Sequence, residues 1–149
     1  MADAIFKQCL DRVVTDIKAL ALTGVKSYNV VTRWMPWDSY HFEEGITVHP
    51  AKEAITDGAG TAGRDDIGYG CQVTMVQANH SDLTANMNQH LQWQESIRKK
   101  FMNQRLGAIT SVMKCTVQVK DVPIPKAFIK ENYLTHALIV RAWSRETRG

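Results

Sequence analysis

The spacing of apolar residues predicts two amphipathic helices. In the first, apolar side chains recur every three or four positions, as expected for a helix with one buried face. They are Ile5, Phe6, Cys9, Leu10, Val13, Ile17, Leu20 and Ala21. Asp3 can cap the start of this helix, and Gly24 can end it in the left-handed conformation.

The second helix is expected from Leu83 to Phe101, after a turn over residues 79–82. It carries two adjacent apolar stripes, Leu83, Met87 and Leu91 in one and Trp93, Ile97 and Phe101 in the other. His90 and Gln94 are expected on its polar surface. Its last turn is basic, which suits the negative end of the helix dipole.

Alternating and β-branched residues predict the strands of a sheet. The expected strands are 27–34, 46–49, a central strand with Tyr69, Cys71, Val73 and Met75 on one face, 112–119 and 135–143. In the strand at 112–119, the inward side chains are expected to be Met113, Cys115, Val117 and Val119. Residues 127–133 have an ambiguous pattern that fits a short helical turn.

These elements predict an α+β fold, a mostly antiparallel sheet of four to six strands packed against two amphipathic helices. A chain of 149 residues is expected to form a single domain. Residues 51–63 form a long Gly-rich loop by composition, and the polar residues 144–149 are expected to be a mobile tail.

Charge is divided unevenly along the chain, although the net charge is only +3. Residues 38–66 contain seven acids and two cations, whereas residues 98–149 contain eleven cations and three acids. Unlike segments of this kind can pair head to tail between copies of one chain, or they can be two separately solvated surfaces.

Cysteine use and the N-terminal sequence indicate an intracellular, soluble protein. Cys9, Cys71 and Cys115 each occupy an apolar position, so they are expected to be small buried hydrophobes in a reducing compartment. The N-terminal residues have no uninterrupted apolar core and do not resemble a signal peptide. No apolar run approaches the roughly 18 residues of a membrane span.

Motifs that would indicate catalysis or a cofactor are weak. Residues 58–63 match G-x-G-x-x-G, but a loop precedes them and Asp65 and Asp66 follow, so the context of a dinucleotide site is missing. The five histidines are scattered without metal-ligand spacing. The adjacent pairs Glu43–Glu44 and Asp65–Asp66 are poor acid–base dyads, because neighbouring residues on a strand point to opposite faces. No cofactor or metal is expected.

The sequence does not decide the roles of two further clusters of residues. Arg98, Lys99, Lys100 and Arg105 form a basic cluster that fits either phosphate contact or a solvated helix end. Trp34, Met35 and Trp37, around Pro36, fit either a partner surface or the core.

The order of these elements and a few short patterns resemble the small neck and tail-completion proteins of tailed bacteriophages, including the tail terminators. The resemblance covers most of the chain. After a helix ending near Gly24, it rests on Arg33-Trp34-Met35-Pro36-Trp37, Ile46-Thr47-Val48-His49-Pro50, Arg64-Asp65-Asp66-Ile67-Gly68-Tyr69, Ile97-Arg98-Lys99-Lys100-Phe101 and Ser144-Arg145-Glu146-Thr147-Arg148-Gly149.

The resemblance implies a structural virion protein without catalytic residues, assembled in the host cytoplasm. In such families an α/β subunit forms a ring, commonly a hexamer, at the end of the tail tube and contacts other neck and tail-tube proteins. Ring closure needs two unlike surfaces on each subunit. The candidate interface residues are Glu43, Glu44, Asp65, Asp66, Arg98, Lys99, Lys100, Arg105, Arg145 and Arg148.

Three alternatives remain. The chain could be another neck or connector protein of the same particle, or a tail-tube subunit, and DNA could pass through a lumen that it lines. It could be a small nucleic-acid-binding module that uses residues 98–105. A small enzyme is the fourth reading, for which the sequence nominates no residues.

Overall fold

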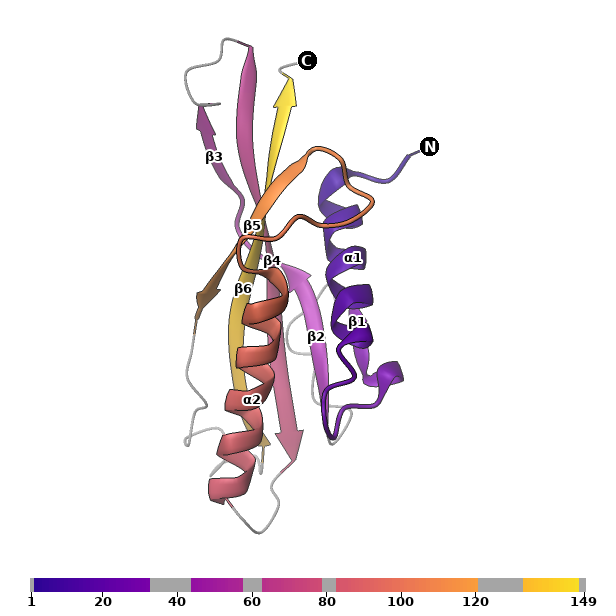
Figure 1. Cartoon of the computed structure of the whole chain (residues 1–149), viewed down its shortest axis with the longest axis vertical. Coiled ribbons are helices and arrows are strands. Elements are labelled where there is room, and N and C mark those ends of the chain that lie inside the picture. The colour runs from indigo at the N-terminus through magenta and orange to yellow at the C-terminus, as the bar shows by residue number, and fades with distance from the viewer. Residues whose placement is uncertain (1, 33–43, 58–62, 79–82, 121–132, 148–149) are drawn as a thin grey trace.

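The computed structural model describes residues 2–32, 44–57, 63–78, 83–120 and 133–147. These residues form one six-stranded sheet with two helices, and Figure 1 shows both helices lying along the same face of the sheet. The predicted α+β class and the predicted number of strands are confirmed. The expectations for residues 33–43, 58–62, 79–82, 121–132 and 148–149 lie outside the described part of the chain.

The sheet is antiparallel except at one edge. Its order is β1-β2-β4-β6-β5. Strand β3 lies outside this order and pairs with β4, on the same side of β4 as β2. Among the strands of the described residues, β1 and β2 are the pair that runs parallel. The strands are β1 (Val30–Thr32), β2 (Glu44–Pro50), β3 (Ala54–Asp57), β4 (Arg64–Ala78), β5 (Val112–Val119) and β6 (Tyr133–Thr147).

The two longest strands, β4 and β6, form the centre of the sheet and pair along their whole length. Odd-numbered residues of β4 face the helices, and the predicted set of four there is fully or nearly buried: Tyr69, Cys71, Val73 and Met75. In β5 the prediction holds for Cys115 and for Val117, which packs against the core, whereas Met113 is half-buried and Val119 is exposed. A register shift between Val112 and Lys114 interrupts the simple alternation expected for this strand.

Helix α1 (Ile5–Ala19) covers the β1–β2–β4 side of the core and buries Cys9, Leu10, Val13 and Ile17. Its predicted ends are wrong. Ala4, not Asp3, occupies the N-cap position, and the Asp3 carboxylate instead accepts a hydrogen bond from Lys7. The helix ends at Ala19, because Ala21 already has a positive φ of 49°, before Gly24 is reached.

Helix α2 (Leu83–Phe101) packs on the β5–β6 side, and one of its two predicted stripes is buried. Trp93, Ile97 and Phe101 are in the core. In the other stripe, Met87 is half-buried and Leu91 is 47% exposed, so neither belongs to the buried core. The buried face continues instead through Asn86 and His90, against the expectation that His90 lies on the polar surface.

Three expectations about strands and loops are also corrected. The strand expected from residue 27 begins at Val30, after a 3₁₀ turn over Ser27–Asn29. The expected loop at 51–63 contains β3, which pairs with β4. The expected mobile tail is part of β6 as far as Thr147, because residues 144–147 pair with Arg64–Ile67 of β4.

Gly70 is required by a close approach between β4 and the segment that follows β2. A Cβ at this position would lie 3.1 Å from the Lys52 carbonyl oxygen and 3.1 Å from Ala51 Cβ. We expect Gly70→Ala to lower the free energy of unfolding by about 1–3 kcal/mol, because the backbone must shift. Gly107→Ala is the control, since its new Cβ would meet only the movable end of Arg12. Equal denaturation midpoints for the two variants would contradict this account.

Candidate functional site

The candidate interface residues fall in two regions, and the first is a projecting end of the sheet. We call it the arm; it consists of β3, residues 64–67 of β4 and residues 144–147 of β6. Figure 1 shows these strand ends extending beyond both helices. The arm and the two residues that precede β3 carry five acids, Glu53, Asp57, Asp65, Asp66 and Glu146, and three cations, Lys52, Arg64 and Arg145.

Asp66 and Arg145, both predicted interface residues, pair with each other inside the arm. They face one another in the β4–β6 register. Arg145 Nε donates to Asp66 Oδ1 at 2.8 Å, and Arg145 Nη2 donates to Asp66 Oδ2 at 3.0 Å. This two-point contact lowers the pKa of the Asp66 carboxyl and raises the pKa of Arg145. Their charges are therefore already matched within one subunit.

Further contacts hold the last residues of β6. The Tyr69 hydroxyl donates to Glu146 Oε2 at 2.6 Å, and the Ser144 hydroxyl donates to Ser111 Oγ at 2.9 Å. Burial and the neighbouring Glu146 carboxylate raise the pKa of Tyr69 beyond its ordinary range. Together with the Asp66 ion pair, these bonds explain why residues predicted to be mobile are part of the sheet.

The second region is the basic C-terminal end of α2, as predicted. Arg98, Lys99 and Lys100 form the last turn, and Arg105 follows it. All four side chains are exposed. Lys99 is paired with Glu95 at 2.6 Å, one turn earlier, and this contact lowers the pKa of Glu95.

The remaining candidates are placed as follows. Glu44 begins β2, where its backbone pairs with Gln77, and Asp65 lies half-buried on β4 opposite Glu146. Glu43 and Arg148 lie outside the described residues. The structure thus brings Asp65, Asp66 and Arg145 together on the arm, and it places the basic cluster on a different element.

Sequence reasoning missed a pair of buried histidines between α2 and β6. His90 and His136 are 0% and 1% exposed, and their Nδ1 atoms are 2.8 Å apart. One Nδ1 must carry the proton that the other accepts, so the two rings adopt opposite neutral tautomers. The spacing of Asn86, His90, Trp93 and Ile97 could have revealed this face, because it is itself helical.

Burial strongly disfavours the charged form of both rings. It lowers the pKa of His90 to about 3, with a smaller effect of His136, and it lowers the pKa of His136 to about 4. Within the described residues, neither Nε2 atom has a hydrogen-bond partner. The pair is therefore neutral at physiological pH and contributes a directional contact rather than a charge.

The histidines belong to a larger layer of buried polar groups at one end of the core. The side-chain amide of Gln77 on β4 donates to Asn86 and Gln89 on α2, at 3.2 and 2.7 Å. Gln89 Nε2 in turn donates to the Thr23 carbonyl at 2.7 Å. This chain of bonds joins the sheet, α2 and the segment after α1.

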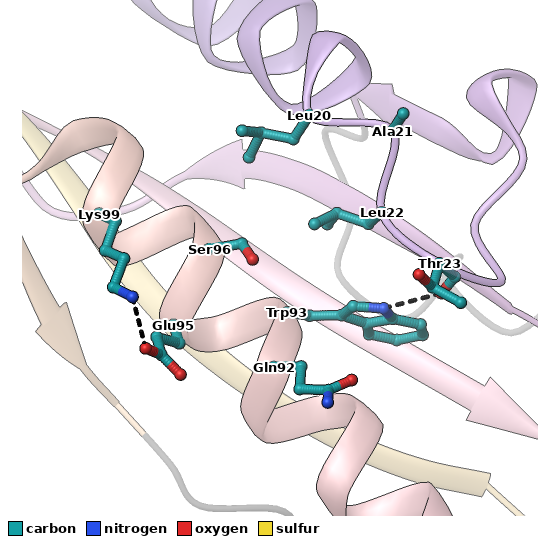
Figure 2. A pocket seen from close by; sticks show the side chains of 9 residues that line it. All are labelled: Leu20, Ala21, Leu22, Thr23, Gln92, Trp93, Glu95, Ser96 and Lys99. Atoms are coloured by element: carbon teal, nitrogen blue, oxygen red, sulfur yellow. Dashed lines mark hydrogen bonds and ion pairs between the residues drawn. The ribbon is translucent and has the colours of Figure 1, made fainter.

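A surface groove of about 390 Å³ lies where that segment meets α2. Figure 2 shows residues 20–23 on one side and the α2 side chains on the other, with Trp93 Nε1 donating to the Thr23 carbonyl at 2.9 Å. Its charged side chains, Glu95 and Lys99, are paired with each other. The groove holds no arrangement of nucleophile, base and orienting group.

The three cysteines are free and buried, as predicted. Burial raises the pKa of the Cys9 and Cys115 thiols to about 12 and that of Cys71 well above its usual range, so these thiols stay protonated.

In the described part of the chain, no group of three or more His, Cys, Asp or Glu side chains could hold a metal ion. The same residues include no helix with the length and apolar character that crossing a membrane requires.

The described residues thus offer two oppositely charged surface regions and a buried polar layer. Comparison of the chain with models of protein families gives no match, and none of the curated proteins matches its sequence.

Proposed function

We propose that this chain is a structural virion protein of a tailed bacteriophage. It forms a ring, with a hexamer favoured, at the head-proximal end of the tail, where it caps the tail tube and joins it to the head. In this proposal its partners are other copies of itself and neighbouring neck and tail proteins, and it has no catalytic role.

The observation that carries the proposal is the separation of unlike charge on one subunit. The arm has more acids than cations, whereas six cations lie on or next to the end of α2, on β5 or directly after it: Arg98, Lys99, Lys100, Arg105, Lys114 and Lys120. A closed ring is built from heterologous contacts, in which one surface of a subunit meets a different surface of the next. Oppositely charged surfaces also favour the correct pairing over self-pairing of either surface.

The first test is the mass of the purified protein by light scattering, followed by negative-stain imaging. We expect discrete particles near 100 kDa, six times the chain mass of 16.8 kDa, with ring-shaped views. Long filaments would favour a tail-tube subunit instead. A species of 16.8 kDa at all concentrations would contradict self-assembly into a ring.

Charge reversal tests the basic surface. We expect Arg98→Glu with Lys100→Glu to weaken assembly at least tenfold, on the order of 1.4 kcal/mol, because two attractive contacts become repulsive. Lys18→Glu with Lys26→Glu is the matched control, since both lysines are exposed and the change in net charge is the same. Equal weakening by both double variants would mean that only net charge matters.

The acidic surface is tested by charge reversal at Glu53, which is exposed. Asp66 is unsuitable for this test, because it is already paired with Arg145.

A second candidate function is nucleic-acid binding through the same basic region. The exposure of Arg98, Lys100 and Arg105 favours it. Three phosphate contacts predict a log–log salt slope of about −2 to −3. Unchanged elution with and without an oligonucleotide at low salt would count against this function.

A further inference from the structure

Among the strands that the structure describes, none pairs with the outer edge of the second half of β5. Backbone groups of an antiparallel strand point alternately to its two sides. Lys120 N–H donates to the Ala137 carbonyl of β6, so the even-numbered residues here direct their backbone groups toward β6. Val117 and Val119 therefore direct theirs away from β6. In the described part of the chain, Val117 N–H reaches only the sulfur of Met102, and Val119 has no hydrogen-bond partner on that side. We call residues 117–119 the open β5 edge.

The beginning of the same strand shows what a covered edge looks like in this protein. Asn103 N–H donates to the Cys115 carbonyl, and Cys115 N–H donates to the Gln104 carbonyl, both at 2.8 Å. The segment after α2 therefore acts as a short added strand beside Cys115. It stops there, and the open β5 edge lies immediately beyond it.

Exposed apolar side chains accompany the open β5 edge. Val119 is 41% exposed, and Met102, whose sulfur lies against Val117, is 40% exposed. An unpaired strand edge next to apolar side chains is the arrangement that accepts a strand from another chain.

The opposite edge of the sheet offers a matching strand. Within the described residues, β3 pairs only with β4, and its Ile55 side chain is 65% exposed. Ile55 is opposite Ile67, which packs on the helix side of the sheet. Val119 is opposite Leu138 and lies on that same side. A β3 strand placed beside β5 in a continuous sheet would thus bring Ile55 next to Val119.

Charge supports the same pairing. Glu53, which is exposed, directly precedes β3. On the helix side of the open β5 edge, Arg98 lies one helical turn before Met102, whose N–H donates to the Arg98 carbonyl. Lys120 follows the edge on the other side of the sheet, where its Nζ donates to Gln72 Oε1 at 3.0 Å. An acid therefore lies beside one edge and a cation beside the other.

We propose that β3 of one copy of this chain adds as a strand to the open β5 edge of the next copy, with Ile55 covering Val119 and Met102. The contact joins opposite edges of the same sheet, so it is heterologous and can be repeated around a ring. The proposal rests on the proposed function, because it names the strands through which that ring closes.

A charge swap tests the contact. We expect Ile55→Lys to weaken self-association at least tenfold, because the new cation replaces an apolar contact on the helix side of the sheet, where Arg98 lies. We expect Val119→Glu to do the same, because it places a carboxylate beside the strand that Glu53 precedes. The double variant is expected to recover most of the lost association, because the introduced lysine and glutamate meet across the contact. Tyr28→Lys, at a 71% exposed side chain in the 3₁₀ turn before β1 and outside both β3 and β5, is the control and should change nothing.

Single variants that associate like the parent, or a double variant no better than the weaker single variant, would overturn the proposal. So would the absence of self-association at the highest attainable protein concentration. Unchanged thermal unfolding of each variant by circular dichroism shows that the subunit itself is intact.

Cysteine cross-linking gives an independent readout. We expect Ile55→Cys with Val119→Cys to form a ladder of interchain disulfides on oxidation, whereas an equal mixture of the two single variants stops at dimers. The native cysteines are all 0% exposed and do not interfere. Rings without this cross-link would overturn the strand contact and leave the proposed function standing. Cross-linked filaments would support the contact and overturn the tail terminator.

Discussion

Acidification from pH 6.5 to pH 4 is expected to lower the free energy of unfolding steeply, chiefly through His90 and His136. Both rings are neutral in the folded protein over most of this range, since burial holds the pKa of His90 at about 3 and that of His136 at about 4, at the acid end of the range. In the unfolded chain the ordinary pKa of histidine is about 6.5, so that state binds the additional protons. Each ring contributes about 1.4 kcal/mol per pH unit, and the pair about twice that.

The sign follows from the lowered pKa. Stability from the pair is complete above pH 6.5, and it is lost as the pH falls toward the folded-state values. Asp66 and Glu95 lose their contribution in a more acidic range, because their carboxyl pKa values are lowered from below 5. Urea denaturation at half-unit pH steps measures the slope.

The matched variant is His90→Leu with His136→Leu, which removes both rings and is expected to flatten the profile between pH 6.5 and 4. His49→Gln is the comparison, because the pKa of His49 is also lowered by burial, on another part of the sheet. It should remove only a minor part of the slope. NMR titration of the unaltered protein gives a second readout, and imidazole signals of His90 and His136 that shift near pH 6.5 would contradict the account.

Trp93→Ala is expected to lower the free energy of unfolding by about 3–5 kcal/mol, which is a large part of the stability of a domain of this size. Trp93 is 1% exposed at the centre of α2, its ring lies 4.9 Å from that of His90, and its N–H is bonded to Thr23. Truncation leaves a large cavity and frees the segment after α1. Thermal or urea denaturation monitored by circular dichroism measures the change.

Two variants of α2 separate the causes. Trp93→Phe keeps most of the volume and loses the N–H, so we expect about 1 kcal/mol from the hydrogen bond, with a further contribution from the smaller ring. Leu91→Ala removes an apolar side chain from the same helix at an exposed position and should cost less than about 1 kcal/mol. A cost for Leu91→Ala as large as that for Trp93→Ala would contradict the observed orientation of α2.

The sequence predicted the fold class and the core of β4 because both depend on strong periodic patterns. Tyr69 to Met75 alternate with polar residues and small glycines, so only one assignment of faces buries them. The wrong face of α2 shows the limit of this reasoning. Its two apolar stripes are adjacent, and the polar side chains Asn86 and His90 take the buried place that Leu91 was expected to fill, because Gln77 and His136 of the sheet supply their partners.

Other errors arose where partners are distant in sequence. Residues 144–147 are polar and look like a tail, but Asp66, Tyr69 and Ser111 bind them across the sheet. Among the candidate interface residues, the basic cluster could be located from the helix end alone. The pairing of Asp66 with Arg145 could not, because it depends on the register between two strands far apart in the chain.

The β4–β6 register has a consequence for how the long strands find their alignment during folding. Alternation of apolar and polar residues rejects a shift by one residue, which would turn every side chain to the wrong face, but a shift by two preserves all faces. Side-chain size distinguishes those remaining alignments, because Gly68 and Gly70 lie opposite Trp143 and Arg141. A two-residue shift would place large side chains opposite each other at some positions, leave gaps at others, and separate Asp66 from Arg145. Side-chain volume and charge therefore destabilise misaligned sheets, in addition to the hydrophobic pattern.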